Sequence, residues 1–236
     1  MGAALNFEWD ETTQHVFRCR LPFCDVTIGL VHGGGEALLV DTGTTLTEAR
    51  AIAADVMTLT GCSVSHILLT HNHFDHILGH SAFRGARTYC SPEVVATMAT
   101  GVQELRADAV EHGADADEVD RAVAALTAPA EPITAAVVGL GGAEVTISHP
   151  GRGHTDHDLI AVVAGVDRTV VFCGDLVEES GDPCIDEHSD LAAWPATLHR
   201  VLAAGSDAAV YVPGHGAPVD ADFVRRQAAW LAGRAT

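Results

Sequence analysis

The chain has 236 residues, of which 47% are hydrophobic and 19% charged, a composition typical of a globular protein and not of a disordered chain. Its 32 acidic residues outnumber 13 basic residues, all of them Arg, so the formal net charge is −19 at pH 7. A field of this sign repels phosphate groups, which argues against a nucleic-acid partner or a membrane surface and favours the holding of divalent cations.

Short runs rich in β-branched and aromatic residues predict strands along most of the chain. The runs cover residues 15–19, 25–32, 36–41, 65–70, 86–90, 143–149, 159–164, 169–175 and 208–213. Some of them are continuously apolar, such as ILL in 65–70 and VVF in 169–175. Continuous apolar runs are typical of strands that are buried on both faces.

Three helical patterns lie between these strands. Residues 45–59 begin with a Thr-x-x-Glu capping box. Residues 190–205 begin with Asp and end with Gly, and Pro195 predicts that the first turn is separate or kinked. Residues 220–234 have an acidic start and a basic end, which suits the helix dipole. Strands and helices that alternate in this way predict an α/β sandwich.

Residues 92–128 differ from the rest of the chain because no strand pattern interrupts them. We interpret them as a helical insertion of two helices joined at Gly-Ala-Asp. Such an insertion either covers a site as a lid, forms an oligomer face, or packs as a plain appendage. With this insertion included, residues 1–236 are expected to form a single domain.

The stretch HNHFDH, residues 71–76, places three histidines and an aspartate directly behind a predicted strand. On an extended segment the side chains of residues i and i+2 point the same way, so His71 and His73 can bind one cation. Asp75 and His76 lie on the turn that follows and can reach a second point nearby. Imidazole and carboxylate groups suit Zn²⁺, Fe or Mn²⁺. The pattern therefore predicts metal binding, and two sites rather than one.

Three further candidate ligands follow other predicted strands. His154 lies in GRGHTDHD, Asp175 ends TVVFCGD, and His215 follows AAVYVPG. Binding residues collect on the loops at one edge of a sheet, so we expect these three to meet HNHFDH in space. A glycine precedes each of them and allows the backbone to turn tightly.

In chain order, the motifs DTG (41–43), HNHFDH, GHT (153–155), CGD (173–175) and PGHG (213–216) resemble those of the metallo-β-lactamase superfamily. The resemblance spans about residues 25–216. It implies an αββα sandwich of the metallo-β-lactamase type, with a dinuclear metal site at one edge.

Carried over by position, the resemblance implies a ligand role for each motif residue. The first metal would be held by His71, His73 and His154, the second by Asp75, His76 and His215, and Asp175 would bridge them. Two divalent ions per chain are expected, with zinc as the first choice and iron or manganese as alternatives. Asp41 is implied to support the site from behind by accepting the outer N–H of a ligand histidine. A turn cap is the alternative role for Asp41.

The resemblance also implies the chemistry. Two cations lower the pKa of a water between them, and the bridging hydroxide would attack a small ester, lactone, thioester or amide. The metals would also stabilise the oxyanion. Asp75 is the predicted catalytic residue, because it can orient the hydroxide and pass its proton to the leaving group.

Three alternatives stay open at this stage. A mononuclear iron-dependent oxygenase acting on persulfides or thiols is disfavoured by the full second ligand set. A weak β-lactamase is disfavoured because Asp175 stands where the zinc-dependent β-lactamases carry Cys, and because the chain has no Lys to hold the antibiotic carboxylate. A non-enzymatic metal-binding regulator is disfavoured because closed structural sites need no open position.

Several residues near the motifs are weaker candidates. His157 and Arg152 are candidate substrate contacts; for His157 the alternative is a surface histidine beside carboxylates. Tyr89 and Tyr211 lie in predicted strands, so we expect both to pack in the core. The loop 178–190 should lie near the metal edge and be solvated.

Cysteine usage and the N-terminus bear on the compartment. The six cysteines form no C-x-x-C pair, which argues against a thiolate zinc site. The first residues, MGAALNFEWDETTQ, lack the basic and apolar regions of a signal peptide, and no apolar stretch approaches a membrane span. We therefore expect a cytoplasmic protein with reduced thiols and a small-molecule substrate.

Overall fold

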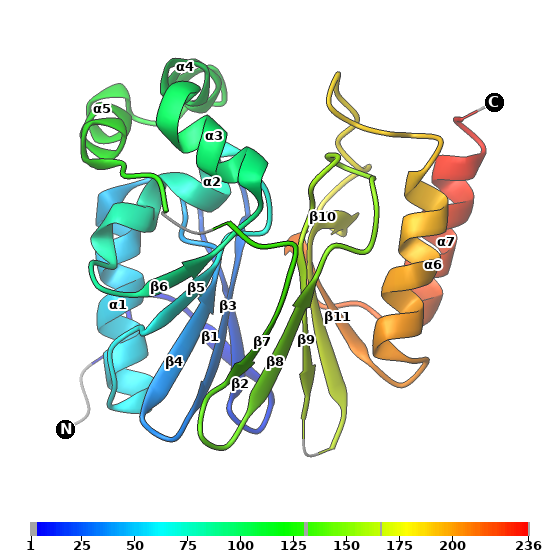
Figure 1. The fold of residues 1–236 in the computed structure, drawn as a ribbon, viewed down its shortest axis with the longest axis horizontal. Helices are drawn as coiled ribbons and strands as arrows, with labels where there is room; N and C mark the ends of the chain where they lie inside the picture. The colour runs from blue at the N-terminus through cyan, green and yellow to red at the C-terminus, as the bar shows by residue number, and fades with distance from the viewer. Residues whose placement is uncertain (1–3, 130–131, 166, 236) are drawn as a thin grey trace.

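The computed structural model describes residues 4–129, 132–165 and 167–235. Two mixed β-sheets lie face to face, and helices cover their outer faces (Figure 1). This arrangement confirms the predicted αββα sandwich. Among the described residues, no helix combines the length and the apolar character needed to cross a membrane.

The first sheet has the strand order β1-β2-β3-β4-β5-β6. Its strands are β1 Trp9–Thr13, β2 Val16–Arg20, β3 Thr27–Gly33, β4 Glu36–Val40, β5 His66–Leu68 and β6 Arg87–Tyr89. Strands β1 to β4 pair antiparallel, whereas β4, β5 and β6 pair parallel. Strand β1 was not predicted, because it is an edge strand with the mostly polar sequence WDETT and a single buried residue.

The second sheet has the strand order β11-β10-β9-β8-β7. Its strands are β7 Ala135–Gly139, β8 Glu144–Ser148, β9 Ile160–Ala164, β10 Thr169–Glu178 and β11 Val210–His215. All pairs are antiparallel except β10 with β11. Strand β7 was also missed, since it is an exposed edge strand with the weak sequence AAVVG.

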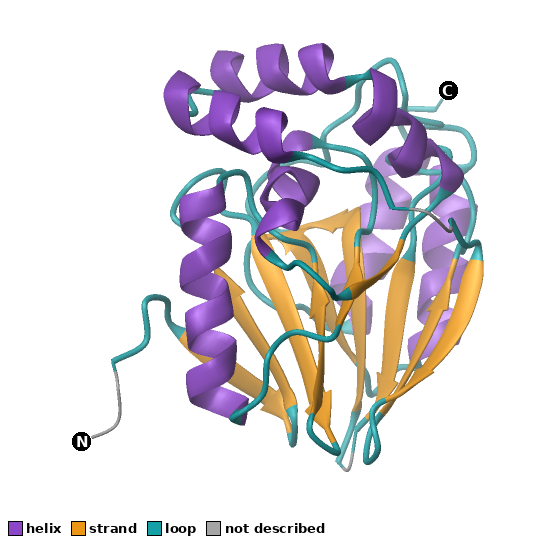
Figure 2. Ribbon diagram, turned by 60° about the vertical axis from the view of Figure 1, so that its left-hand side comes forward, coloured by secondary structure: helices purple, strands orange, loops and turns teal. Residues whose placement is uncertain are grey.

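Helices pack on both outer faces of the sandwich (Figure 2). Helix α1, Leu46–Thr60, lies against the first sheet and begins with the predicted capping box. Helices α6, Trp194–Gly205, and α7, Ala221–Ala232, lie against the second sheet. Helix α6 begins four residues later than predicted, because Pro195 belongs to its first turn and a separate turn precedes it.

The insertion at 92–128 contains three helices, not the two that were predicted. They are α3 Pro92–Thr100, α4 Val102–Glu111 and α5 Ala116–Ala125. The long first helix is interrupted at Gly101, whose N–H bonds to the carbonyl of Thr97 and closes α3 before α4 begins. The predicted Gly-Ala-Asp connection precedes α5, and its last residue, Asp115, is the N-cap of that helix. All three helices lie across one edge of the sandwich (Figures 1 and 2).

Apolar side chains fill the space between the two sheets. Val31, Leu38, Phe172 and Val212 belong to this buried cluster. The sheets approach closely, since a Cβ on Gly29 would lie 2.4 Å from the ring of Phe172. A tightly packed interior of this kind holds the strand ends in fixed positions, and those strand ends carry the candidate site.

Candidate metal centre

The HNHFDH segment leaves β5 as an extended chain and then becomes helical. His73 is the N-cap of the short helix α2, Phe74–Ile77, which continues into the 3₁₀ helix η1, Leu78–Ala82. The turn that was predicted for Asp75 and His76 is therefore the first turn of a helix. The change from extended to helical backbone turns these two side chains towards a second point.

Asp175 lies inside β10 and not at its end, which corrects the predicted strand boundary at 175. The pairing of β10 with β11 shifts register on both sides of Gly174, and pairing resumes at Glu178. A bulge of this kind redirects a side chain out of the regular strand pattern. The neighbouring strand accommodates it with Gly214, because a Cβ there would lie 1.8 Å from Asp175 Oδ1.

The first ligand set comprises His71, His73, His154 and Asp175, with one donor atom from each within 4.8 Å of the others. His154 Nε2 and His73 Nδ1 are 3.0 Å apart. Asp175 Oδ2 lies 3.5 Å from His71 Nε2 and 3.5 Å from His154 Nε2. Three imidazoles and a carboxylate thus face one point.

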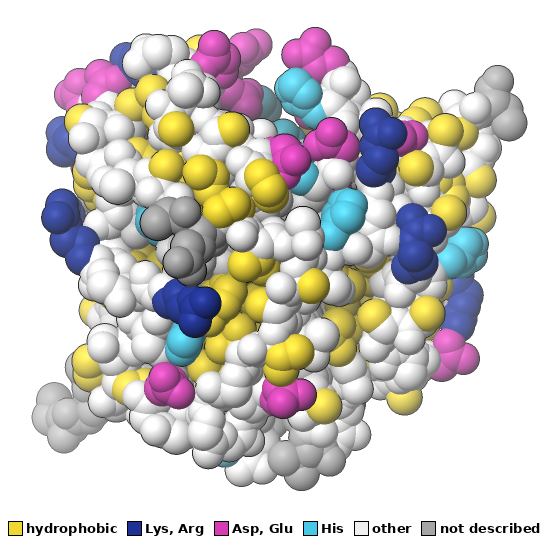
Figure 3. Space-filling view, in the orientation of Figure 1, with side chains coloured by type: hydrophobic (Ala, Val, Ile, Leu, Met, Phe, Trp, Pro, Cys, Tyr) yellow, Lys and Arg dark blue, Asp and Glu magenta, His cyan; other side chains and the backbone are white. Residues whose placement is uncertain are grey.

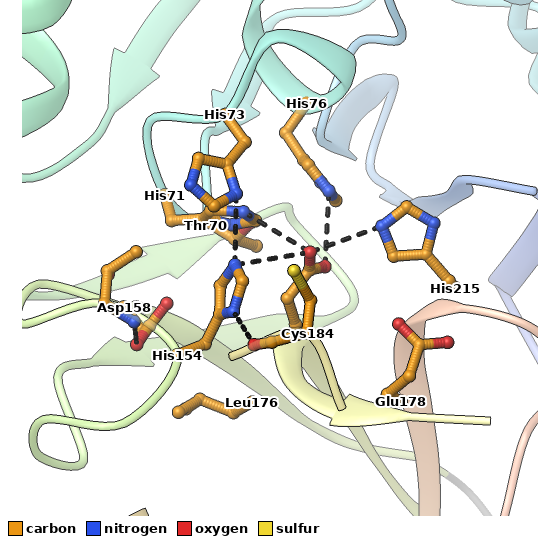
Figure 4. A network of polar contacts seen from close by, with 12 residues as sticks. Thr70, His71, His73, His76, His154, Asp158, Leu176, Glu178, Cys184 and His215 are labelled. Atoms are coloured by element: carbon orange, nitrogen blue, oxygen red, sulfur yellow. Dashed lines mark hydrogen bonds and ion pairs between the residues drawn. The ribbon is translucent and has the colours of Figure 1, made fainter. Parts of the chain in front are cut away.

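The second ligand set comprises Asp75, His76 and His215. Asp75 Oδ2 lies 3.6 Å from His76 Nε2 and 3.4 Å from His215 Nε2. Asp175 contacts this set as well, with Oδ1 3.2 Å from His76 Nε2 and Oδ2 3.2 Å from His215 Nε2. Figure 4 shows the five histidines converging from separate segments. All seven predicted ligands lie in this one cluster, and Asp175 contacts both sets.

Asp41 lies directly behind the cluster. Its carboxylate accepts hydrogen bonds from His76 Nδ1 at 2.9 Å, from the Thr70 N–H at 2.8 Å and from the Thr70 hydroxyl at 2.9 Å. The Thr70 oxygen in turn lies 3.0 Å from His71 Nδ1. Asp41 has a positive φ of 63°, a conformation that Asp tolerates better than most residues. One buried carboxylate therefore orients a histidine of each set.

Backbone carbonyls orient two more histidines, and no residue pattern indicated these partners. His215 Nδ1 donates to the carbonyl of Cys24 at 2.7 Å, and His154 Nδ1 donates to the carbonyl of Cys184 at 3.3 Å. A carbonyl group belongs to every residue, so no residue type marks these partners. Only the folded path of the two loops identifies them.

The two sets differ in their electrostatics. Burial lowers the pKa of His154 to about 4 and that of His71 well below its ordinary value. Burial also opposes the charged forms of His76 and His215, but Asp175 and Asp75 outweigh it. They raise the pKa of His215 to about 10 and the pKa of His76 well above its ordinary range. Without metal, the neutral rings of His71 and His154 thus face the cationic rings of His76 and His215.

Three donor atoms of the cluster are buried without a hydrogen-bond partner among the described residues. They are His71 Nε2, His76 Nε2 and Asp175 Oδ1. A buried polar atom without a partner costs about 1–3 kcal/mol, so it is normally satisfied. Imidazole nitrogens and a carboxylate aimed at a shared point are the donor set of zinc and related ions. The residues therefore fit bound metal ions.

The predicted substrate contacts His157 and Arg152 lie in different surroundings from each other. His157 is buried and pairs with Asp156 at 2.9 Å, so it is not the surface histidine that was considered as its alternative role. Arg152 is exposed and pairs with Asp190 at 3.3 Å. Neither the His157 nor the Arg152 side chain forms a hydrogen bond or ion pair with the seven predicted ligands. Tyr89 and Tyr211 are buried in the core, as predicted.

The loop between β10 and α6 lies beside the cluster and is largely exposed. Glu187 and His188 are solvated, as expected for this loop. Asp186 was not singled out from the sequence, yet its Oδ2 lies 3.8 Å from His73 Nε2. Acidic and histidine side chains gather where the two halves of the molecule meet above the sheets (Figure 3).

The comparisons with known proteins agree with this architecture. A family model described as the metallo-beta-lactamase superfamily matches residues 21–215. The crystal structure of the metallo-β-lactamase FIM-1 from Pseudomonas aeruginosa, in its mono-zinc form, superposes with a TM-score of 0.72 at 21% identity. The match covers 100% of this chain and 98% of that one. The structure of TMB-1 superposes with a TM-score of 0.70 at 17% identity, covering 99% and 100%. At these identities the superpositions show a shared fold.

Proposed function

Because the chain belongs to the metallo-β-lactamase superfamily, we propose that it is a hydrolase that uses two divalent metal ions. Zinc is the first choice for both ions. The proposed substrate is a small ester, lactone, thioester or amide. The observation that carries the proposal is the position of Asp175, whose two carboxylate oxygens face the histidines of both ligand sets.

The chain supplies a separate set of groups for each ion. His71, His73 and His154 would hold one, and Asp75, His76 and His215 would hold the other, with Asp175 between them. Two ions bound in this way supply a hydroxide nucleophile at neutral pH and polarise the scissile carbonyl. The protein keeps the histidine rings in place through Asp41, Thr70 and two loop carbonyls, so little reorganisation is needed when substrate arrives.

Asp75 is the proposed catalytic residue of the chain. Its Oδ2 faces the histidine rings of the second set, and its backbone is fixed in the first turn of α2. A carboxylate in this position can orient the nucleophile and carry its proton to the leaving group. Removal of this proton carrier should lower kcat more than substrate affinity.

A single-iron oxygenase would leave the second ligand set without a role. The side chains of this set are nearly enclosed, with Asp75, His76 and His215 exposed by 8%, 0% and 13%. Within this set His76 Nε2 is buried without a hydrogen-bond partner among the described residues, and burial of such an atom is costly, which favours an ion at this position as well. The grouping of these side chains therefore supports two ions over one.

Elemental analysis of protein purified without chelator or added metal tests the proposal. About two zinc per chain are expected, together with cleavage within a panel of esters, lactones, thioesters and β-lactams. Asp175→Ala should lower metal content and hydrolysis together, since it removes a group shared by both sets. Asp182→Ala removes an exposed carboxylate of the neighbouring loop and should change neither.

Two results would contradict this function. One is hydrolysis at the wild-type rate in Asp175→Ala. The other is about one iron per chain with oxygen consumed on thiol or persulfide substrates, which would identify the oxygenase instead.

A further inference from the structure

We propose that Asp186, on the exposed loop after β10, is a positioning residue for the first ligand set. It holds His73 in the tautomer and orientation that present Nδ1 to a metal ion. The inference rests on the proposed function, because it concerns an ion that the first set is proposed to bind. Three observations support it. They are the orientation of His73, the hydrogen bonds by which the loop fixes Asp186, and the contacts of that loop with the segment that carries His154.

His73 faces the cluster differently from the other four ligand histidines. Those four present Nε2 to Asp175, whereas His73 presents Nδ1, which lies 3.0 Å from His154 Nε2. His73 Nε2 therefore points to the other side, where Asp186 Oδ2 lies 3.8 Å away. A neutral imidazole can bind a metal through Nδ1 only when its proton is on Nε2. A carboxylate facing Nε2 favours that tautomer.

The loop itself fixes the direction of the Asp186 carboxylate. Its Oδ1 accepts a hydrogen bond from the His188 N–H at 2.7 Å and lies 3.2 Å from the Ser189 hydroxyl. The Ser189 hydroxyl in turn accepts the N–H of Asp186 at 3.2 Å. With Oδ1 engaged by its own loop, Asp186 directs Oδ2 towards His73. The carboxylate is thus held before any metal binds.

The same loop is docked on the segment that carries His154. The Ser189 hydroxyl donates to the carbonyl of His154 at 2.9 Å, and the Asp190 N–H donates to the carbonyl of Gly153 at 2.8 Å. The Cys184 carbonyl accepts the N–H of the His154 ring. Residues 184–190 therefore support two of the three histidines of the first set, and Asp186 is the member that faces His73.

The exposure of this pair makes it sensitive to substitution. The side chains of His73 and Asp186 are 21% and 32% exposed, whereas His76 and its partner Asp41 are 0% and 2% exposed. His76 is held both by its complete burial and by its contact with the buried Asp41. His73 has less protein around it, so the loss of one partner should affect it more. A change at Asp186 should thus weaken one metal equivalent and leave the fold intact.

Zinc titration of metal-free protein tests this proposal, with Asp186→Asn as the variant. Asn keeps the size of Asp and an oxygen for the His188 N–H, but it places an NH₂ group opposite His73 Nε2. That group cannot accept the ring proton. Glu187→Gln is the matched control, because it makes the same charge change at the next residue, whose side chain is 88% exposed.

We expect Asp186→Asn to bind one of two zinc equivalents about 10- to 100-fold more weakly, with the other within about twofold of wild type. Its melting temperature without metal should match that of wild type. Glu187→Gln should match wild type in both zinc affinities and in melting temperature. Cobalt titration followed by absorbance should show the same loss of one site.

Three results would overturn the inference. If wild type and Asp186→Asn bind two equivalents equally well, Asp186 does not position His73, although the proposed function survives. If Asp186→Asn weakens both equivalents and lowers the melting temperature, the loop has a structural role only. If wild type itself binds no zinc, the proposed function fails and this inference fails with it.

Discussion

The two ligand sets look alike in composition but are supported by different parts of the molecule. In the second set, His76 is held by the buried Asp41 and His215 by a carbonyl at 2.7 Å. In the first set, His73 and His154 depend on residues of the exposed loop 184–190. The difference teaches that the second metal position depends on buried groups, whereas the first, which Asp41 reaches only through Thr70, also depends on a surface loop.

This contrast has a physical cause in the chain order. Asp41 directly follows β4, which pairs with β5, and its N–H bonds to the carbonyl of Leu68, so the sheet itself places the carboxylate beside HNHFDH. The loop after β10 has no strand or helix between 179 and 193, and it reaches the site through side chains and single hydrogen bonds. Regions with few buried contacts open at lower free energy than sheet interiors. Perturbations of the two supports should therefore have different consequences.

The largest effect is expected from Asp41→Ala. The change leaves the Thr70 N–H and the His76 ring without their buried acceptor, and breaking a buried charged pair typically costs roughly 3–5 kcal/mol. Urea unfolding of metal-free protein should show a loss of that size. Asp41→Asn keeps an acceptor for Thr70 and should lose less. Equal stability of wild type and Asp41→Ala would remove the distinction between interior and surface support.

The pH dependence of the metal-free protein should separate the two sets. The pKa of His154 is lowered by burial to about 4, below the roughly 6.5 of an unfolded histidine. The unfolded chain therefore takes up this proton first as the pH falls, and stability decreases between about pH 6.5 and 4. The pKa of His215 is raised to about 10, because Asp175 and Asp75 outweigh its burial. Its contribution is complete below about pH 6.5 and is lost as the pH rises through 10.

Urea unfolding across this pH range checks both directions. Each unit of pKa shift corresponds to about 1.4 kcal/mol, so the acid arm of His154 should amount to about 3 kcal/mol and the alkaline arm of His215 to about 5 kcal/mol. His154→Gln should reduce the acid arm alone, because His71 still contributes to it, and His215→Gln should reduce the alkaline arm alone, because His76 still contributes to that one. Identical profiles for the two variants would show that the sets do not titrate separately.

The sequence was most informative where the residue types themselves carry the chemistry. HNHFDH, Asp175 and His215 stand out because metal-binding side chains follow apolar runs, and strand ends meet at one edge of a sandwich. Asp41 was found through the resemblance and lies where that resemblance implies. Prediction failed for β1, whose sequence WDETT is mostly polar, and for β7, whose sequence AAVVG is rich in Ala and Gly, residues that are depleted in strands.

Prediction also failed for features set by tertiary structure. The bulge at Gly174 and the close approach of Gly214 to Asp175 depend on the pairing of two strands that are distant in sequence. The carbonyl partners of His154 and His215 have no residue signature. Asp186 is one of several acidic residues in its loop, and only the path of that loop selects it. The interruption at Gly101 was missed because the helical periodicity continues on both sides.

The smallest effect is expected from Ser189→Ala, which removes a single link between the loop and the first set. The hydroxyl donates to the carbonyl of His154, not to its ring, so the ring keeps its bond to the Cys184 carbonyl. One lost hydrogen bond at a partly exposed site costs about 1 kcal/mol, which corresponds to about fivefold in affinity. Zinc titration should show that decrease for one equivalent only, and a smaller decrease than in Asp186→Asn. A decrease that is larger than in Asp186→Asn would mean that docking of the loop, rather than the carboxylate facing His73, supports the first set.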